Sequence, residues 1–167
     1  MIARNLAAAV AIVAAATLPG AASAQLPQGA KAPTFTTQGA LAGKSFTFDL
    51  AKALKKGPVV LYFFPKAFTQ GCTLEANAFA EAMEDFHKAG ATVVGMSADD
   101  LPTLKRFSTE ECRNKFPVAT ANKALIKAYD VGFVMNGQDT GLSNRTSYVI
   151  GRDVSRTVAK VKELKGR

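Results

Sequence analysis

A continuous apolar run, Val59–Phe64, constrains the fold of this chain more than any other feature. It consists of β-branched, aliphatic and aromatic residues (VVLYFF) without polar alternation. Runs of this kind are typical of strands that are buried on both faces of a sheet covered by helices. A second apolar run, Ala91–Met96, follows about one helix length later. The two runs and the segment between them predict a strand–helix–strand unit.

The segment between the two runs has helical periodicity. Phe79, Ala82, Met83 and Phe86 are spaced at i, i+3, i+4 and i+7, which places them on one face of a helix. Gly90, just beyond this pattern, is a good helix stop. We therefore expect an amphipathic helix that begins after Gly71 and ends near residue 88.

The remaining segments complete an α/β pattern. Residues 25–37 are expected to run over the surface as an irregular leader, because they contain three proline and glycine residues. Helices are expected at Leu50–Lys56, from Asp100 to about Arg113 and from Asn122 to about Tyr129, and strands at Ser45–Phe48, Phe116–Ala119, Thr146–Ile150 and Val154–Val161. This order predicts a mixed β-sheet flanked by helices, with a hairpin at the end. We expect residues 25–167 to form a single domain.

The first 24 residues are expected to be a secretory signal peptide. Arg4 is their only charge, an apolar run from Leu6 to Leu18 follows, and Ala22-Ser23-Ala24 has the small-x-small form of a cleavage site. The alternative is an uncleaved anchor, although the run is short for a membrane span. Export predicts a periplasmic location, or secretion, with no stable membrane insertion after cleavage.

Charge and composition exclude several classes of function. The net charge is +8, but the basic residues are scattered and no basic run exceeds Lys55-Lys56. A solvated basic surface is therefore favoured over a nucleic-acid-binding surface. With His87 as the only histidine and two widely separated cysteines, no zinc pattern exists, and we expect neither a metal nor a cofactor.

Cys72 is the strongest candidate for a reactive residue. It follows a buried strand and stands at the start of the amphipathic helix, where free N–H groups and the helix dipole favour an anion. A thiolate is such an anion, and it is the nucleophilic form of cysteine. The alternatives are an inert buried thiol, or a structural disulfide with Cys112, the only other cysteine.

Three further residues fit a site built around Cys72. The hydroxyl of Thr69, three residues earlier, is placed to turn back on the thiolate, and Pro65 is placed to shape the loop and shield the sulfur from water. Arg145, at the start of a late strand, is our candidate for the cation that stabilises a negatively charged leaving oxygen. Its alternative is an ordinary surface arginine.

The residues from Pro65 to Cys72 match a known family pattern. They have the form Pro-x-x-x-Thr-x-x-Cys, and the stretch Val60–Ala76 (VLYFFPKAFTQGCTLEA) resembles the Q-type peroxiredoxins, also called bacterioferritin-comigratory proteins. The resemblance extends over most of the chain. It implies a thioredoxin-like fold, with Cys72 as the peroxidatic cysteine, Pro65 and Thr69 as its loop partners and Arg145 as the site's arginine.

The resemblance also concerns a second thiol, which would condense with oxidised Cys72. Many Q-type members have this resolving cysteine five residues after the first, but here the position is Asn77. Other members have it on the following helix, and Cys112 falls near the end of the helix expected there. We therefore expect Cys112 to be the resolving cysteine, with a small buried hydrophobic residue as the alternative reading.

The function expected from these observations is a two-cysteine, thiol-dependent peroxidase active in antioxidant defence. Its substrates would be hydrogen peroxide and organic hydroperoxides, its reductant a thioredoxin-like or other dithiol protein, and its state a monomer or weak homodimer. A thioredoxin-like disulfide oxidoreductase is disfavoured, because Glu75 stands where the second cysteine of a Cys-x-x-Cys motif would be. A non-enzymatic module with a structural Cys72–Cys112 bond is the third possibility.

Overall fold

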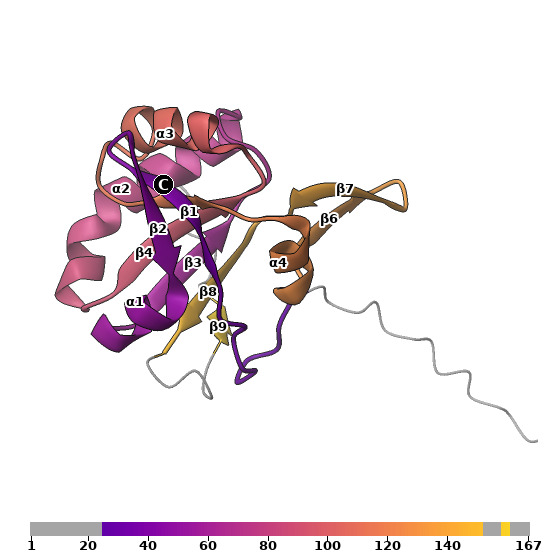
Figure 1. The fold of residues 1–167 in the computed structure, drawn as a ribbon, viewed down its shortest axis with the longest axis horizontal. Helices are drawn as coiled ribbons and strands as arrows, with labels where there is room; N and C mark the ends of the chain where they lie inside the picture. Colours follow the sequence, from indigo (N-terminus) through magenta and orange to yellow (C-terminus); the bar gives the residue numbers. More distant parts are fainter. Residues whose placement is uncertain (1–24, 152–157, 161–167) are drawn as a thin grey trace, which may run out of the picture.

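The computed structural model describes residues 25–151 and 158–160 of the chain (Figure 1). Helices and strands alternate through most of this part. In chain order they are β1 (Thr36–Leu41), β2 (Lys44–Asp49), α1 (Leu50–Lys56), β3 (Val59–Phe63), α2 (Gln70–Lys88), β4 (Thr92–Ser97), α3 (Leu101–Glu110), β5 (Val118–Thr120), α4 (Lys123–Ala128), β6 (Gly132–Met135), β7 (Gln138–Ser143), β8 (Thr146–Ile150) and β9 (Val158–Lys160).

Seven strands form one mixed sheet in the order β2-β1-β5-β4-β3-β8-β9. β3 pairs in parallel with β4 and antiparallel with β8, and β4 pairs in parallel with β5. Every residue of β3 is buried, as its continuous apolar sequence predicts. The predicted mixed sheet with flanking helices is confirmed.

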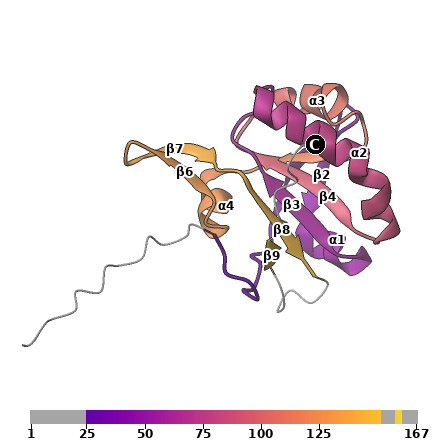
Figure 2. The same cartoon turned by 180° about the vertical axis from the view of Figure 1, so that it is seen from behind.

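The two faces of the sheet support separate apolar clusters. Val59, Leu61 and Phe63 of β3 point to a cluster that includes residues of α1 and α4. Val60, Tyr62 and Phe64 point to the opposite cluster, which includes residues of α2 and α3 and both cysteines. Alternate residues of a strand face opposite sides of a sheet, so β3 serves both layers. Figure 2 shows α2 and α3 together on one side of the molecule.

Helix starts follow the capping residues that the sequence provides. The side chain of Asp49 accepts from the N–H of Lys52 at α1, and that of Asp100 accepts from the N–H of Thr103 at α3. Asn122 caps α4 in the same way. These bonds satisfy N–H groups that have no partner within the helix. The predicted starts of these three helices are therefore confirmed.

The prediction for the end of α3 is wrong. The helix ends at Glu110, three residues before the expected end, and Arg113 and Asn114 follow with φ angles of 52° and 60°. Left-handed backbone at two successive residues cannot continue a right-handed helix. Cys112 consequently lies in a turn beyond the helix and not on the helix itself.

Three strands, β1, β6 and β7, are absent from the sequence-based prediction. β1 begins at Thr36, inside the segment expected to be an irregular leader, and pairs with both β2 and β5. The hairpin of β6 and β7 occupies the segment expected to be a loop, and it projects from the sheet beside α4 in Figures 1 and 2. Its turn is Asn136-Gly137, with φ angles of 52° and 76°, a pair that favours tight hairpins.

The irregular part of the leader is fixed to the fold by tyrosines. The hydroxyl group of Tyr129 donates to the carbonyl of Pro33, and that of Tyr148 accepts from the N–H of Leu26. β9 confirms part of the last predicted strand, whose remainder, like the predicted signal peptide, lies outside the described residues. Among the described residues, no helix has the length and apolar character needed to cross a membrane.

Candidate active site

Cys72 is the third residue of α2 and is 1% exposed. Thr69 is the N-cap, so the sulfur lies within the first helical turn, where the N–H groups and the helix dipole favour negative charge. Ala76, Phe79 and the other buried residues of α2 continue the same apolar face. The thiol therefore combines an apolar environment with an electropositive helix end.

Arg145 lies against this thiol. Its Nη2 atom is 3.3 Å from Cys72 Sγ, and its Nη1 atom donates to the Gly71 carbonyl at 3.2 Å. The strand pairing brings these distant residues together, because Thr146 of β8 is opposite Phe63 of β3. Arg145 therefore projects from the same end of the sheet at which α2 begins.

Gly71 makes this close approach of the guanidinium group possible. A Cβ atom at this position would lie 2.8 Å from Arg145 Nη2, which is shorter than an ordinary van der Waals contact. A larger residue would push the guanidinium group away from Cys72. The glycine before the cysteine thus belongs to the site for steric reasons.

Glu75 is a site residue that the sequence analysis did not identify. Its Oε2 atom accepts from Arg145 Nη1 at 2.7 Å, so Arg145 is shared between Glu75 and Cys72. Burial acts to lower the pKa of Arg145, but the negative charges of Cys72 and Glu75 outweigh it and raise that pKa. The guanidinium group therefore remains charged. An acid one helical turn after Cys72 was the sequence signal for this contact.

Thr69 is placed differently from the expectation. Its hydroxyl group donates to the carbonyl of Lys66 at 3.0 Å and its side chain is exposed. Its carbonyl accepts from the N–H of Thr73, as an N-cap carbonyl does in the first turn of a helix. In the described part of the chain no hydrogen bond joins Thr69 to Cys72. The threonine hydroxyl group is therefore bonded to the backbone of its own loop in this structure.

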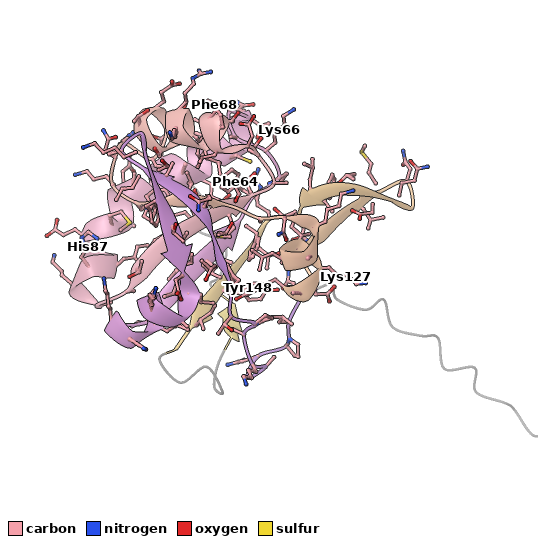
Figure 3. The ribbon with its side chains drawn as sticks, viewed as in Figure 1. Phe64, Lys66, Phe68, His87, Lys127 and Tyr148 are labelled. Carbon is pink, nitrogen blue, oxygen red and sulfur yellow. The ribbon has the colours of Figure 1, made fainter. Side chains whose placement is uncertain are left out.

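Pro65 belongs to the connection between β3 and α2, which two hydrogen bonds of Phe64 hold at its first residue. Phe64 donates its N–H to Met96, and the hydroxyl group of Ser143 donates to the Phe64 carbonyl at 2.9 Å. Pro65 itself is half-buried, directly after the residue that these bonds hold. Figure 3 labels Phe64, Lys66 and Phe68 along this connection.

Asp99 anchors the middle of the same loop. Its Oδ2 atom accepts from the N–H of Ala67 at 2.7 Å and from the hydroxyl group of Ser97 at 2.6 Å. Asp99 was not among the site residues predicted from the sequence. Its position could have indicated it, because polar residues at the carboxyl end of a buried strand often lie at functional sites of α/β sheets.

Phe107 of α3 contacts both the loop and the turn that contains Cys112. Its ring packs edge-on against Phe68 at 5.3 Å and stacks on Phe64 at the same distance. Its carbonyl accepts from the N–H of Cys112 at 3.0 Å. Phe107 therefore connects the loop before Cys72 with the turn that contains Cys112.

Cys112 is fully buried and belongs to the same apolar cluster as Cys72, and both thiols are free. Burial, and to a smaller extent the charge of Glu111, raise the pKa of the Cys112 thiol. Asn77 of α2 reaches toward this turn, with its amide nitrogen 3.4 Å from Glu111 Oε2. Cys112 is therefore protonated and unreactive as long as the turn stays closed.

The described residues contain no group of three or more His, Cys, Asp or Glu side chains that could hold a metal ion. His87 is exposed near the end of α2 and is labelled in Figure 3. Cys72 is the nucleophile that the geometry offers, because it lies at the start of α2 beside Arg145. Arg145 is its counter-ion, in place to stabilise negative charge that develops on an oxygen atom of the molecule that the sulfur attacks.

Comparisons with known proteins agree on the family to which the chain is similar. The family model described as "AhpC/TSA family" matches residues 28–159. Peroxiredoxin Q of Suaeda salsa is 35% identical over 78% of this chain and 58% of its own length. The putative peroxiredoxin bcp of Helicobacter pylori is 34% identical over 59% of this chain and 66% of its own length.

Solved structures have the same fold. Peroxidoxin BcpB of Mycobacterium tuberculosis matches with a TM-score of 0.67 and 29% identity, over 80% of this chain and 82% of that one. The reduced 2-Cys peroxiredoxin of Plasmodium vivax, at 24% identity and a TM-score of 0.69 over 83% and 87% of the two chains, supports the fold. The chain spans less than two thirds of the length of the first curated relatives that it matches. With the family model covering most of its length, the chain belongs to the AhpC/TSA family of peroxiredoxins.

Proposed function

We propose that this protein is a thiol-dependent peroxidase that reduces hydrogen peroxide and organic hydroperoxides. The observation that supports it most directly is the position of Arg145 Nη2, 3.3 Å from Cys72 Sγ at the start of α2. A cation and a helix N-terminus at one sulfur favour the thiolate as nucleophile. The names of the relatives, peroxiredoxin Q and peroxidoxin, agree with this activity.

In the first step the Cys72 thiolate attacks one oxygen of the hydroperoxide. A sulfur–oxygen bond forms and the oxygen–oxygen bond breaks, which leaves Cys72 as sulfenic acid. The leaving oxygen takes up a proton and departs as water or an alcohol. Arg145, charged and shared with Glu75, is in place to stabilise the negative charge that develops on this oxygen.

In the second step Cys112 resolves the sulfenic acid. The Cys112 thiol condenses with the Cys72 sulfenic acid, so that a disulfide forms and the hydroxyl group leaves with the thiol proton as water. A thioredoxin-like or other dithiol protein then reduces this disulfide and becomes a disulfide itself. Both thiols lie in one apolar cluster, which supports their pairing, and both are free, so the two sulfurs have to come within bonding distance for the disulfide to form.

Peroxide consumption with dithiothreitol tests both steps in the wild type, Cys72→Ser and Cys112→Ser. We expect Cys72→Ser to be inactive. After one equivalent of peroxide, intact mass should show loss of two hydrogens in the wild type and gain of oxygen in Cys112→Ser. A wild type that consumes no peroxide, with Cys72 unmodified, would exclude the peroxidase and favour a binding module.

We further propose that the protein is exported and acts in antioxidant defence in the periplasm. The support is the sequence of residues 1–24, with one charge, an apolar run and a small-residue cleavage pattern. Cell fractionation of a producing bacterium, with N-terminal sequencing of the product, tests this. A mature chain that begins at Gln25 in the periplasmic fraction supports export, whereas an intact N-terminus in the cytoplasm contradicts it.

A further inference from the structure

Tyr62 has a buried hydroxyl group without a hydrogen-bond partner. It is the one buried side-chain polar atom in this condition among the residues that the structure describes. The side chain is fully buried, and its ring stacks on Phe79 of α2 at 4.3 Å. Burial raises the pKa of Tyr62 well above its usual value, and the charges of Cys112, Glu75 and Cys72 add to this effect. The phenol is therefore a neutral group without a hydrogen-bond partner, in the same apolar cluster as the two cysteines.

The other two buried tyrosines are paired. Tyr129 donates to the Pro33 carbonyl, and Tyr148 donates to the Tyr129 carbonyl, both at 2.7 Å. Both belong to the cluster on the opposite face of the sheet. A buried hydroxyl group without a partner destabilises the state in which it is buried. Of the three buried tyrosines, only Tyr62, on the face with the cysteines, has a hydroxyl group that destabilises the packed state in this way.

The turn that contains Cys112 packs against the Tyr62 ring through its last residue. We define the Cys112 turn as residues 111–116. Phe116 packs edge-on against this ring at 5.9 Å, and Cys112 is close enough that its thiolate form would raise the pKa of the phenol. The backbone of the turn is strained, because Arg113 and Asn114 are both left-handed. Two independent features therefore oppose the closed packing of this one segment.

We propose that Tyr62 is a positioning residue for the second thiol step, because its unpaired hydroxyl group destabilises the closed Cys112 turn. Water can bond to the hydroxyl group once the turn opens, so opening removes the penalty that closure imposes. The open turn releases Cys112 from its buried site to meet Cys72. This inference rests on the proposed function, in which Cys112 condenses with the Cys72 sulfenic acid to give a disulfide and water. Tyr62 is neither oxidised nor consumed.

Tyr62→Phe tests the proposal, because it removes the hydroxyl group and keeps the ring. In the reduced protein we expect a higher urea midpoint and slower amide exchange in residues 111–116. After a single addition of peroxide we expect sulfenic acid to form on Cys72 at the wild-type rate. Disulfide formation should then be about fivefold slower, as expected for loss of the penalty of one unpaired hydroxyl group. At excess peroxide the fraction of Cys72 oxidised to sulfinic acid should rise.

Tyr129→Phe is the matched control, since it removes a hydroxyl group that has a partner on the other face of the sheet. We expect it to lower the urea midpoint and to leave the disulfide rate unchanged. If Tyr62→Phe also loses stability, or forms the disulfide at the wild-type rate, the proposal is overturned. A wild type that forms no sulfenic acid would overturn the proposed function instead. The exchange comparison in the reduced protein would still decide whether Tyr62 destabilises the turn.

Discussion

At the scale of single residues, Arg145 is the group on which the site depends. Its guanidinium group donates to three acceptors at once: Cys72 Sγ, the Gly71 carbonyl and Glu75 Oε2. The planar fork of an arginine can reach several acceptors in fixed directions, whereas the ammonium group of a lysine acts as a point charge. The geometry at Cys72 therefore needs an arginine and not merely a positive charge.

Arg145→Lys should slow the reaction of Cys72 with peroxide about 100-fold or more, because one preorganised donor at the developing oxyanion is lost. Glu75→Gln keeps an acceptor for Arg145 and should have a smaller effect. Stopped-flow kinetics of the first turnover measures both variants. An Arg145→Lys protein that reacts at the wild-type rate would show that charge alone suffices.

The Cys112 thiol should make stability depend on pH. Its pKa is raised in the folded protein by burial, so its stabilising effect is fully present below about pH 8.5, the pKa of an unfolded cysteine, and is lost as the pH rises further. Between about pH 8.5 and 9.5, reduced wild type should lose up to about 1.4 kcal/mol more stability than reduced Cys112→Ala. Urea unfolding at several pH values measures the difference. Equal slopes for the two proteins would contradict it.

Cys72 was a candidate from the sequence because it begins a helix after a buried strand, and Arg145 because such a site needs a cation and the family resemblance implies an arginine there. Sequence reasoning did not identify Glu75, Asp99 or Tyr62. Their roles depend on contacts between segments that are distant in the sequence, such as Tyr62 with the Cys112 turn. A tyrosine within an apolar run looks like any core aromatic residue. That its hydroxyl group lacks a partner can be recognised only in three dimensions.

At the scale of elements, the loop between β3 and α2 depends on its fixed points. Asp99 is the central one, since it accepts from the backbone of Ala67 in the loop and from the side chain of Ser97 in β4. A carboxylate that accepts from a backbone N–H forms a comparatively strong hydrogen bond. Asp99 therefore holds the loop at the end of β4, which is part of the sheet.

Asp99→Ala should lower the free energy of unfolding by about 1–3 kcal/mol, because the N–H of Ala67 loses its partner. It should also slow the reaction of Cys72 with peroxide. Asp99→Asn keeps an acceptor and should recover part of both losses. Ser97→Ala, which removes only the second bond to Asp99, is the control and should change the rate less. Urea unfolding and first-turnover kinetics provide the two measurements.

Most elements could be predicted from local patterns, and the errors have local causes. The ends of α1, β3 and α4 followed from capping residues and apolar runs. β1 was missed because its sequence, TTQGAL, has no apolar alternation and is a strand through its pairing with β2 and β5. The end of α3 was wrong because no glycine or proline marks the left-handed residues Arg113 and Asn114.

At the scale of the whole molecule, two apolar clusters share one sheet. β3 contributes alternate residues to each cluster, and strands on both sides of it connect to the rest of the sheet. Neither cluster can be disrupted without disturbing the strand that supports the other. The fold should therefore behave as one cooperative unit.

Leu61→Ala should lower the free energy of unfolding by about 2–5 kcal/mol, because Leu61 is fully buried on the face opposite the cysteines. Circular dichroism and the alkylation of Cys112 should still report the same unfolding midpoint. Leu74→Ala, at a residue 64% exposed, is the control and should change stability little. Different midpoints for the two probes would show that the layers unfold separately.

The position of Phe107 has a consequence for how such a protein can change during evolution. Its ring packs against the loop before Cys72, and its carbonyl holds the N–H of Cys112. A substitution here alters the surroundings of both thiols together. A substitution at Phe107 is therefore expected to affect both steps of the proposed mechanism together, and a change in one step alone must come from residues that serve one thiol alone.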